Sequence, residues 1–211
     1  MNTRTLYGIP QRIKVGMIMF SFTSLEGRRV KLVPLELEHV RSLFEVAQEP
    51  EIWKQYPITI ESHDQMQNFV MKALEGLDRK EQYPFAVYDK ELNKFIGSTR
   101  YLRISEANNN LNIGSTWYNP IVWRTVVNTE TKYLMLVYAF ETLNVNRVEI
   151  ITTTENYQSQ KAIERLGAIK EGILRKKYHN LDYIIYSIIN DEWKEVKKRL
   201  EGKLEDAWYV I

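Results

Sequence analysis

Apolar and polar positions along this chain follow two periods, one typical of helices and the other of strands. Apolar residues recur every three or four positions and predict helices at residues 38–48, 62–77, 129–143, 159–166 and 191–204. Runs with strand character occupy residues 30–34, 84–88, 94–104, 111–118, 147–153, 169–174 and 183–189. Since strands and helices are mixed along the whole chain, the pattern predicts an α/β (α+β) fold.

Local residues support several of these boundaries. Polar stretches at residues 89–93 and 105–110 separate three successive strands, as expected of an antiparallel meander. Gly167 follows the helix at residues 159–166, and glycine ends helices because it tolerates positive φ. We therefore expect the helix to stop there.

The chain shows no internal repeat and no linker-like segment, which favours one domain. We assign it to residues 25–211, preceded by an extension at residues 1–24 that is either loose or adds a strand. The apolar part of that extension, residues 15–20, is too short for a signal peptide. No apolar run reaches the length of a transmembrane helix, so we expect no membrane partner.

Composition excludes several kinds of site. The 29 Lys and Arg residues nearly balance 27 Asp and Glu, which argues against nucleic acid as a partner. The absence of cysteine excludes disulfides, thiolate metal sites and a cysteine nucleophile, and it suits a cytoplasmic protein. The three histidines, which share no metal-ligand spacing, give no reason to expect a metal.

Two sequence blocks carry more specific information. Residues 156–168 follow a strand and read N-x-x-S-x-x-A-I-x-x-L-G-A, and residues 113–120 precede a short loop and a long helix. Together with residues 28–34 they resemble the GNAT acetyltransferases, in the branch of the ribosomal-protein N-terminal (alanine/serine) acetyltransferases. The resemblance implies a mostly antiparallel central sheet of about seven strands, flanked by helices, in which the fourth and fifth strands splay apart.

The resemblance also implies acetyl-CoA as co-substrate. Its pantetheine arm would lie between the splayed strands and pair with the main chain of Trp117 and Tyr118, while Asn156 and Ser159 would face the cofactor. The amides that open a helix bind anions. The pyrophosphate is therefore expected at the start of the long helix, on Arg124, Thr125, Val126, Val127, Asn128 and Thr129.

The phosphate loop departs from the family pattern (Q/R)-x-x-G-x-(G/A). Trp123, Val126 and Asn128 occupy its three signature positions. A β-branched residue disfavours positive φ, so the loop either takes another backbone shape or binds the cofactor weakly. This departure supports an alternative function, a catalytically degenerate GNAT-fold binding or interaction module.

For catalysis, the resemblance implies direct attack of a primary amine on acetyl-CoA in a ternary complex. Ser159 is the candidate proton donor to the thiolate, and its alternative role is at the start of a helix. Many relatives place a glutamate where this chain has Asn112, which cannot act as a base. Tyr118 and Glu155 are the substitutes, although Tyr118 equally fits packing or the acyl pocket.

The acceptor is either an amine-bearing small molecule or a protein N-terminus. The aromatic segment at residues 53–57 lies where relatives place acceptor-binding residues, and a lid over the core is its alternative role. Trp208 and Tyr209, which we expect to be exposed, leave room for a homodimer.

Overall fold

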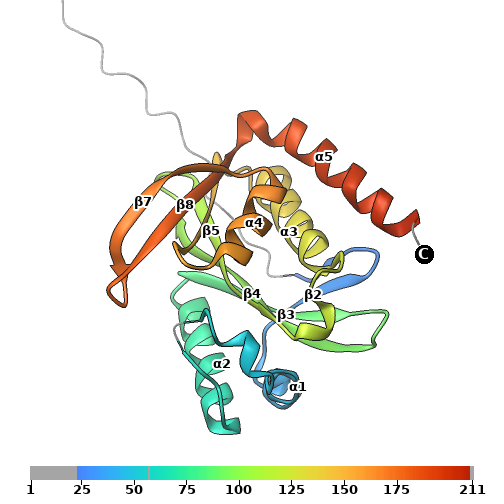
Figure 1. The fold of residues 1–211 in the computed structure, drawn as a ribbon, viewed down its shortest axis with the longest axis vertical. Coiled ribbons are helices and arrows are strands. Elements are labelled where there is room, and N and C mark those ends of the chain that lie inside the picture. Colours follow the sequence, from blue (N-terminus) through green and yellow to red (C-terminus); the bar gives the residue numbers. More distant parts are fainter. Residues whose placement is uncertain (1–22, 57, 210–211) are drawn as a thin grey trace, which may run out of the picture.

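The computed structural model describes residues 23–56 and 58–209 (Figure 1). Its sheet has the order β1-β2-β3-β4-β5-β6-β8-β7, and all neighbours are antiparallel except β5 and β6. The strands are β1 (Leu25–Glu26), β2 (Val30–Pro34), β3 (Gln82–Asp89), β4 (Lys94–Ser105), β5 (Asn110–Tyr118), β6 (Arg147–Thr153), β7 (Ile169–Tyr178) and β8 (Leu181–Ile189). The predicted mixed sheet is confirmed, with eight strands because the short β1 adds one.

Helices cover both faces of this sheet. The helices are α1 (Val40–Val46), α2 (His63–Asp78), α3 (Val127–Val137), α4 (Tyr157–Leu166) and α5 (Asn190–Tyr209). Helices α1 and α2 lie on one face, and α3, α4 and α5 lie on the other (Figure 1). Each face has its own buried apolar cluster. Strand side chains are therefore buried whether they point toward α1 and α2 or toward α3, α4 and α5.

The long helix predicted at residues 129–143 differs from the observed one at both ends. Helix α3 begins at Val127, and a π-helical turn at Tyr138–Thr142 follows it. The end of α4 is as predicted, because Gly167 takes a φ of 98° in the left-handed region. The spacing of apolar residues could not reveal the π-helical turn. Its apolar residues Tyr138, Ala139 and Phe140 are consecutive and all buried, so they do not follow the spacing of an α-helix.

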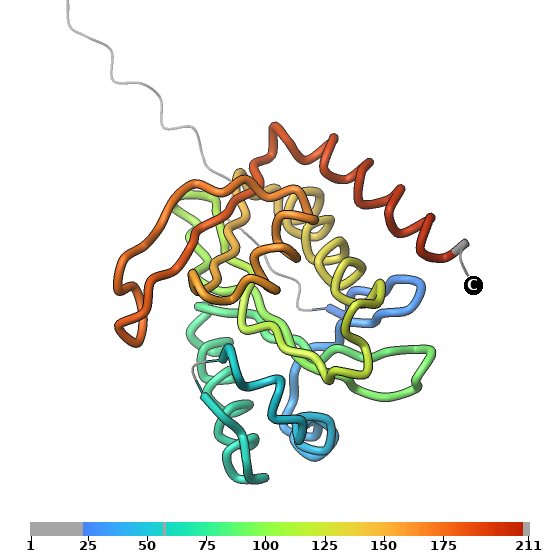
Figure 2. The backbone as a smooth tube through the Cα atoms, in the orientation of Figure 1, coloured from blue at the N-terminus to red at the C-terminus, as the bar shows by residue number. Residues whose placement is uncertain are grey.

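The C-terminal helix returns to the far end of the sheet. In Figure 2 α5 runs from the end of β8 back toward β1 and β2. There the Arg28 guanidinium lies 5.1 Å from the centre of the Trp208 ring. Trp208 is half-buried, so the expected exposure was wrong for this residue. The side chain of Tyr209 and residues 1–22 of the predicted extension lie outside the described residues. None of the helices in the described part of the chain is both long and apolar enough to cross a bilayer.

A buried carboxylate fastens α3 to the start of β2. The Glu130 side chain, 1% exposed, accepts hydrogen bonds from the main-chain N–H groups of Arg28, Arg29 and Val30. Burial raises the pKa of Glu130, while these three donors oppose that effect. The carboxylate thus supplies acceptors to main-chain groups that precede and open the strand, and it fixes the helix against the sheet.

We expect Glu130→Gln to lower the free energy of unfolding by about 2 kcal/mol or more, because an amide replaces one acceptor oxygen by a donor facing N–H groups. Urea unfolding monitored by circular dichroism measures this loss. Glu141→Gln is the matched control, since Glu141 pairs with Lys197 at the surface and such pairs contribute less than about 1 kcal/mol. Equal losses in the two variants would contradict the anchoring role of Glu130.

Candidate active site

The parallel strands β5 and β6 pair over only a short length. Their register is Asn110↔Arg147, Leu111↔Val148 and Asn112↔Glu149. Beyond this point β5 continues along β4 to Tyr118, and β6 continues along β8 to Thr153. Within the described residues, the facing edges of β5 and β6 therefore have no strand partner there. These edges present main-chain donors and acceptors to whatever enters the gap.

A bulge in β5 accounts for the divergence. Ser98 pairs with Trp117 and Arg100 with Gly114, so two residues of β5 stand opposite one of β4. At the bulge Ser115 has a φ of 46°, in the left-handed region. A bulge bends its strand and increases its twist, and this one begins three residues beyond Asn112, the last residue of β5 paired with β6.

The turn before α3 is held by side chains. The Thr125 hydroxyl donates to the Val122 carbonyl at 2.7 Å and accepts from the Val127 N–H at 3.3 Å. The Trp123 indole donates to the Tyr118 carbonyl at 3.0 Å, which ties the turn to the end of β5.

The amides that open α3 are available for an anion. Of its first three N–H groups, those of Asn128 and Thr129 have no partner among the described residues. Free amides at a helix start, together with the helix dipole, form an anion site.

The left-handed residue of this turn is not where the family pattern suggests. Val126 has φ −67° and ψ −18°, an ordinary helical conformation that suits a β-branched residue. Arg124 instead has a φ of 61°. Val126 at the glycine position was expected to give the phosphate loop either another backbone shape or weak cofactor binding. In this structure the loop has another backbone shape.

Asn156 and Ser159 lie at the start of α4. The Asn156 side chain accepts a hydrogen bond from the Ser159 N–H at 3.0 Å, so it caps the helix. The cap uses the Ser159 main chain and leaves its hydroxyl for another contact. Gln160 donates to the carbonyls of Thr153 and Thr154 and so ties α4 to the end of β6. Because β5 and β6 are parallel, α3 and α4 start at the same end of the gap.

Trp117 and Tyr118 point to opposite faces of the sheet. The Trp117 ring packs in the cluster under α1 and α2, 5.4 Å from the Trp53 ring. Tyr118 packs beneath α3 with its hydroxyl buried near Thr131, and burial raises the pKa of Tyr118 well above its ordinary value. Since this hydroxyl does not reach the surface of the gap, the packing alternative describes Tyr118 better than the role of a base.

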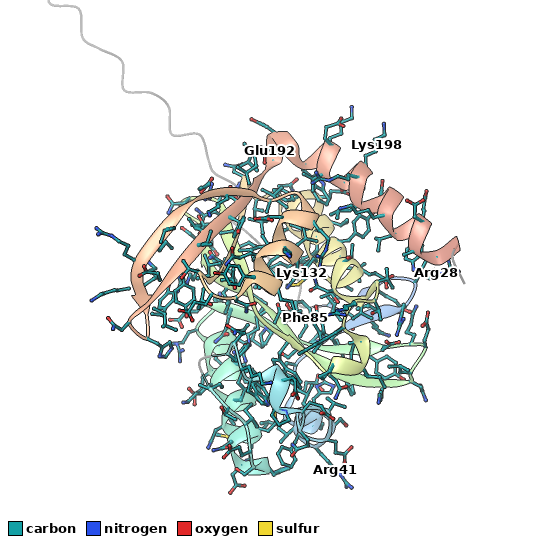
Figure 3. The ribbon with its side chains drawn as sticks, viewed as in Figure 1. Arg28, Arg41, Phe85, Lys132, Glu192 and Lys198 are labelled. Carbon is teal, nitrogen blue, oxygen red and sulfur yellow. The ribbon has the colours of Figure 1, made fainter. Side chains whose placement is uncertain are left out.

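A buried lysine lies under the bulge, and sequence reasoning did not find it. Lys132 is buried between α3 and the sheet (Figure 3), with Nζ 3.3 Å from the Thr99 hydroxyl and 2.5 Å from that of Thr116. Burial lowers its pKa to about 7. No carboxylate in the described part of the chain pairs with it. The sequence gave no sign that Lys132 is buried. It lies two residues after Glu130 in the predicted helix, and charged residues are ordinarily expected on the exposed side of a helix.

Residues 29–169 match the model of the acetyltransferase (GNAT) domain. This chain belongs to the GNAT acetyltransferase family. It is 27% identical over 179 residues to the uncharacterized N-acetyltransferase p20 of Bacillus licheniformis, which covers 81% of this chain and 98% of that protein. A GCN5-related N-acetyltransferase from Brucella melitensis has a crystal structure with a TM-score of 0.80 and 29% identity, covering 86% of this chain and 85% of that one.

The likeness extends to a GNAT structure that holds the cofactor. The microcin C7 self-immunity acetyltransferase MccE, solved with acetyl-CoA and AMP, has a TM-score of 0.69 and covers 77% of this chain and 93% of its own. At 18% identity this similarity shows the fold alone. Family membership identifies the protein as an acyltransferase of a kind that uses acetyl-CoA.

We expect the stability of the protein to rise with pH between about 7 and 10, because the unfolded chain keeps the Lys132 proton that the folded chain has released. The slope from this residue is about 1.4 kcal/mol per pH unit. Lys132→Met removes that slope and is more stable than the original protein at pH 7, since Thr99 and Thr116 still bond each other at 2.8 Å.

Urea unfolding at several pH values measures the effect. Lys94→Met, at an exposed position, controls for the loss of a lysine as such. A Lys132→Met variant with the same slope as the original protein would show that Lys132 keeps its proton in the folded state.

Proposed function

We propose that this protein transfers an acetyl group from acetyl-CoA to a primary amine by direct attack in a ternary complex. The observation that carries the proposal is the gap between β5 and β6, with the free amides of α3 at its end. Pantetheine is a chain of amides, so it would pair with the main chain of β5 near Trp117 and Tyr118. The pyrophosphate would sit on the turn and helix start at residues 124–129, next to the Arg124 side chain.

The reaction needs no covalent enzyme intermediate. The neutral amine attacks the thioester carbonyl, the C–N bond forms, and the C–S bond breaks as the tetrahedral intermediate collapses. The nitrogen loses a proton to water, and the leaving thiolate gains one. Ser159 is the residue we propose as donor to sulfur, because its hydroxyl is not used by the helix cap, and it takes back a proton from water as it donates. Holding the two substrates in the gap supplies the rest of the rate by proximity.

The first test is binding of acetyl-CoA. Ligand at 100 times its Kd stabilises the folded state by about 2.7 kcal/mol, which raises the melting temperature measurably. Release of free thiol in the presence of an amine panel then tests transfer. Binding without transfer to any amine would favour the catalytically degenerate module, and no binding would overturn the proposal altogether.

We expect Ser159→Ala to lower kcat at saturating acetyl-CoA by about 100-fold or more, because a positioned proton donor is removed, and to leave the Kd of acetyl-CoA nearly unchanged. The helix cap survives this change because it uses the main-chain N–H. Steady-state thiol release and calorimetric titration measure the two quantities, with Ser105→Ala in the distant β4–β5 turn as control. An unchanged kcat would remove Ser159 from the mechanism.

The phosphate turn gives a separate prediction. Val126→Gly lowers stability by about 1 kcal/mol without tightening acetyl-CoA, because Val126 is already helical. Arg124→Gly keeps or raises the free energy of unfolding, since a left-handed non-glycine residue costs about 1 kcal/mol or more. It weakens the binding of acetyl-CoA, because it removes a cation next to the pyrophosphate. Arg124→Asn tolerates the same backbone and isolates the loss of charge. Tighter binding by Val126→Gly would show that the bound loop adopts the family's glycine geometry.

A further inference from the structure

Unpartnered polar atoms gather on the face of the sheet covered by α1 and α2. Among the described residues, eight buried side-chain N or O atoms have no hydrogen-bond partner. Five of the eight belong to four residues of this face: the Tyr56 hydroxyl, the Ser98 hydroxyl, Nε and Nη2 of Arg100, and Nε1 of Trp117. Such atoms are costly to bury, so their concentration in one place indicates a missing ligand group.

These four residues are neighbours. Ser98 and Arg100 share a face of β4 two positions apart, and Trp117 pairs with Ser98 in the sheet. The Arg100 charge is close enough to Tyr56 to lower the pKa of its phenol, although burial raises that pKa overall. The Trp53 ring contacts both aromatic members, at 5.5 Å from Tyr56 and 5.4 Å from Trp117.

Arg100 is the charged centre of this group. Its residue is 6% exposed, and the guanidinium lies 4.3 Å from the centre of the Phe69 ring. Nη1 donates to the Gln82 side chain at 3.2 Å. Among the described residues no carboxylate pairs with Arg100, and burial lowers its pKa. A buried cation without a counter-charge is strongly unfavourable.

The free atoms specify the chemistry of the missing group. Arginine and the indole can only donate hydrogen bonds, and the two hydroxyls can donate as well. Nε and Nη2 lie on the same side of the guanidinium, where they form the two-pronged edge that matches both oxygens of a carboxylate. What this site lacks is therefore a planar, anionic acceptor.

The location connects the site to acyl transfer. Arg100 pairs with Gly114, two residues after the last β5 residue that pairs with β6. The Ser115 side chain, at the bulge, lies close enough to the Tyr56 hydroxyl to lower the pKa of that phenol, but the two are not placed for a hydrogen bond. The donors thus border the point where the strands part, on the face opposite to α3. An acceptor that approaches from the α1 and α2 side would bring its other groups next to Arg100.

We propose that Arg100, with Tyr56 and Trp117, binds a carboxylate of the acceptor, so that the acceptor is an amine that also carries a carboxylate, as amino acids and acidic peptides do. This inference rests on the proposed acetyl transfer and narrows its acceptor. Simple alkylamines and amino sugars lack this group and are poor acceptors.

Matched acceptors that share one amine test the proposal by thiol release: a set of amino acids, their carboxamides and their phosphonate analogues. The carboxylates exceed the carboxamides in kcat/KM by about 10- to 100-fold, the strength of hydrogen bonds to a charged group. Arg100→Met abolishes this preference, and Tyr56→Phe, which removes only the hydroxyl, reduces it severalfold. No preference for carboxylates in the original protein would overturn the proposal, and preference for phosphonates would replace the carboxylate by a phosphate-like group.

Stability separates a binding role of Arg100 from a structural one. Because its charge is unpaired, Arg100→Met should fold with an unchanged or higher melting temperature. A lower melting temperature with the carboxylate preference intact would make Arg100 structural and overturn the proposal. Arg41→Met is the control, since Arg41 lies on the outside of α1 (Figure 3) and pairs only with Glu45 among the described residues.

A binding measurement keeps the proposal testable if acetyl transfer itself is not observed. The carboxylate amino acids alone, at matched ionic strength, raise the melting temperature of the original protein more than their carboxamides do. Arg100→Met loses that difference. Equal shifts with both probes would overturn the carboxylate site, whereas the absence of an acetyl-CoA shift would overturn only the acetyl transfer.

Discussion

The bulge at Ser115 is the constraint on which the rest of the site depends. A parallel pair of strands would otherwise continue its hydrogen bonds, and no gap would exist between β5 and β6. By placing two residues of β5 against one of β4, the bulge bends β5 within the stretch that follows Asn112, where β5 no longer pairs with β6. Trp117 and Tyr118 then hold β5 to β4 from both faces, because one ring is buried under each set of helices.

The two faces of the sheet differ in whether their buried charged side chains have hydrogen-bond partners within the chain. On the α3 face, buried charged residues have internal partners: Glu130 receives three main-chain N–H groups, and Lys132 bonds two threonine hydroxyls. These contacts fix the helix whose amides open onto the gap. A rigid helix start is what an anion site requires, since its donors must be in place before the ligand arrives.

Much of the fold was predictable, and the failures have physical causes. The resemblance carried by residues 113–120 and 156–168 predicted the gap, and Gly167 predicted the end of α4, whereas α4 begins at Tyr157, two residues before the predicted start. The left-handed residue of the turn before α3 was not predicted, since Arg124 carries no sequence signal for positive φ. The bulge at Ser115 was missed for the same reason. Arg100 was missed because alternation predicts a solvent-facing arginine in β4, and that rule fails where helices cover both faces.

Near-zero net charge conceals how unevenly the charges are distributed. The formal charge of +2 sums all 211 residues, yet Arg100, Glu130 and Lys132 are almost wholly buried. Glu130 and Lys132 each meet groups of the chain itself, so the buried charges on the α3 face are satisfied without a ligand. Arg100 and Trp117 can only donate hydrogen bonds, and in the folded chain Nε and Nη2 of Arg100 and Nε1 of Trp117 meet no acceptor among the described residues. An acceptor from outside the chain would satisfy these donors, and this is why we assign the face toward α1 and α2 to binding and not to the core alone.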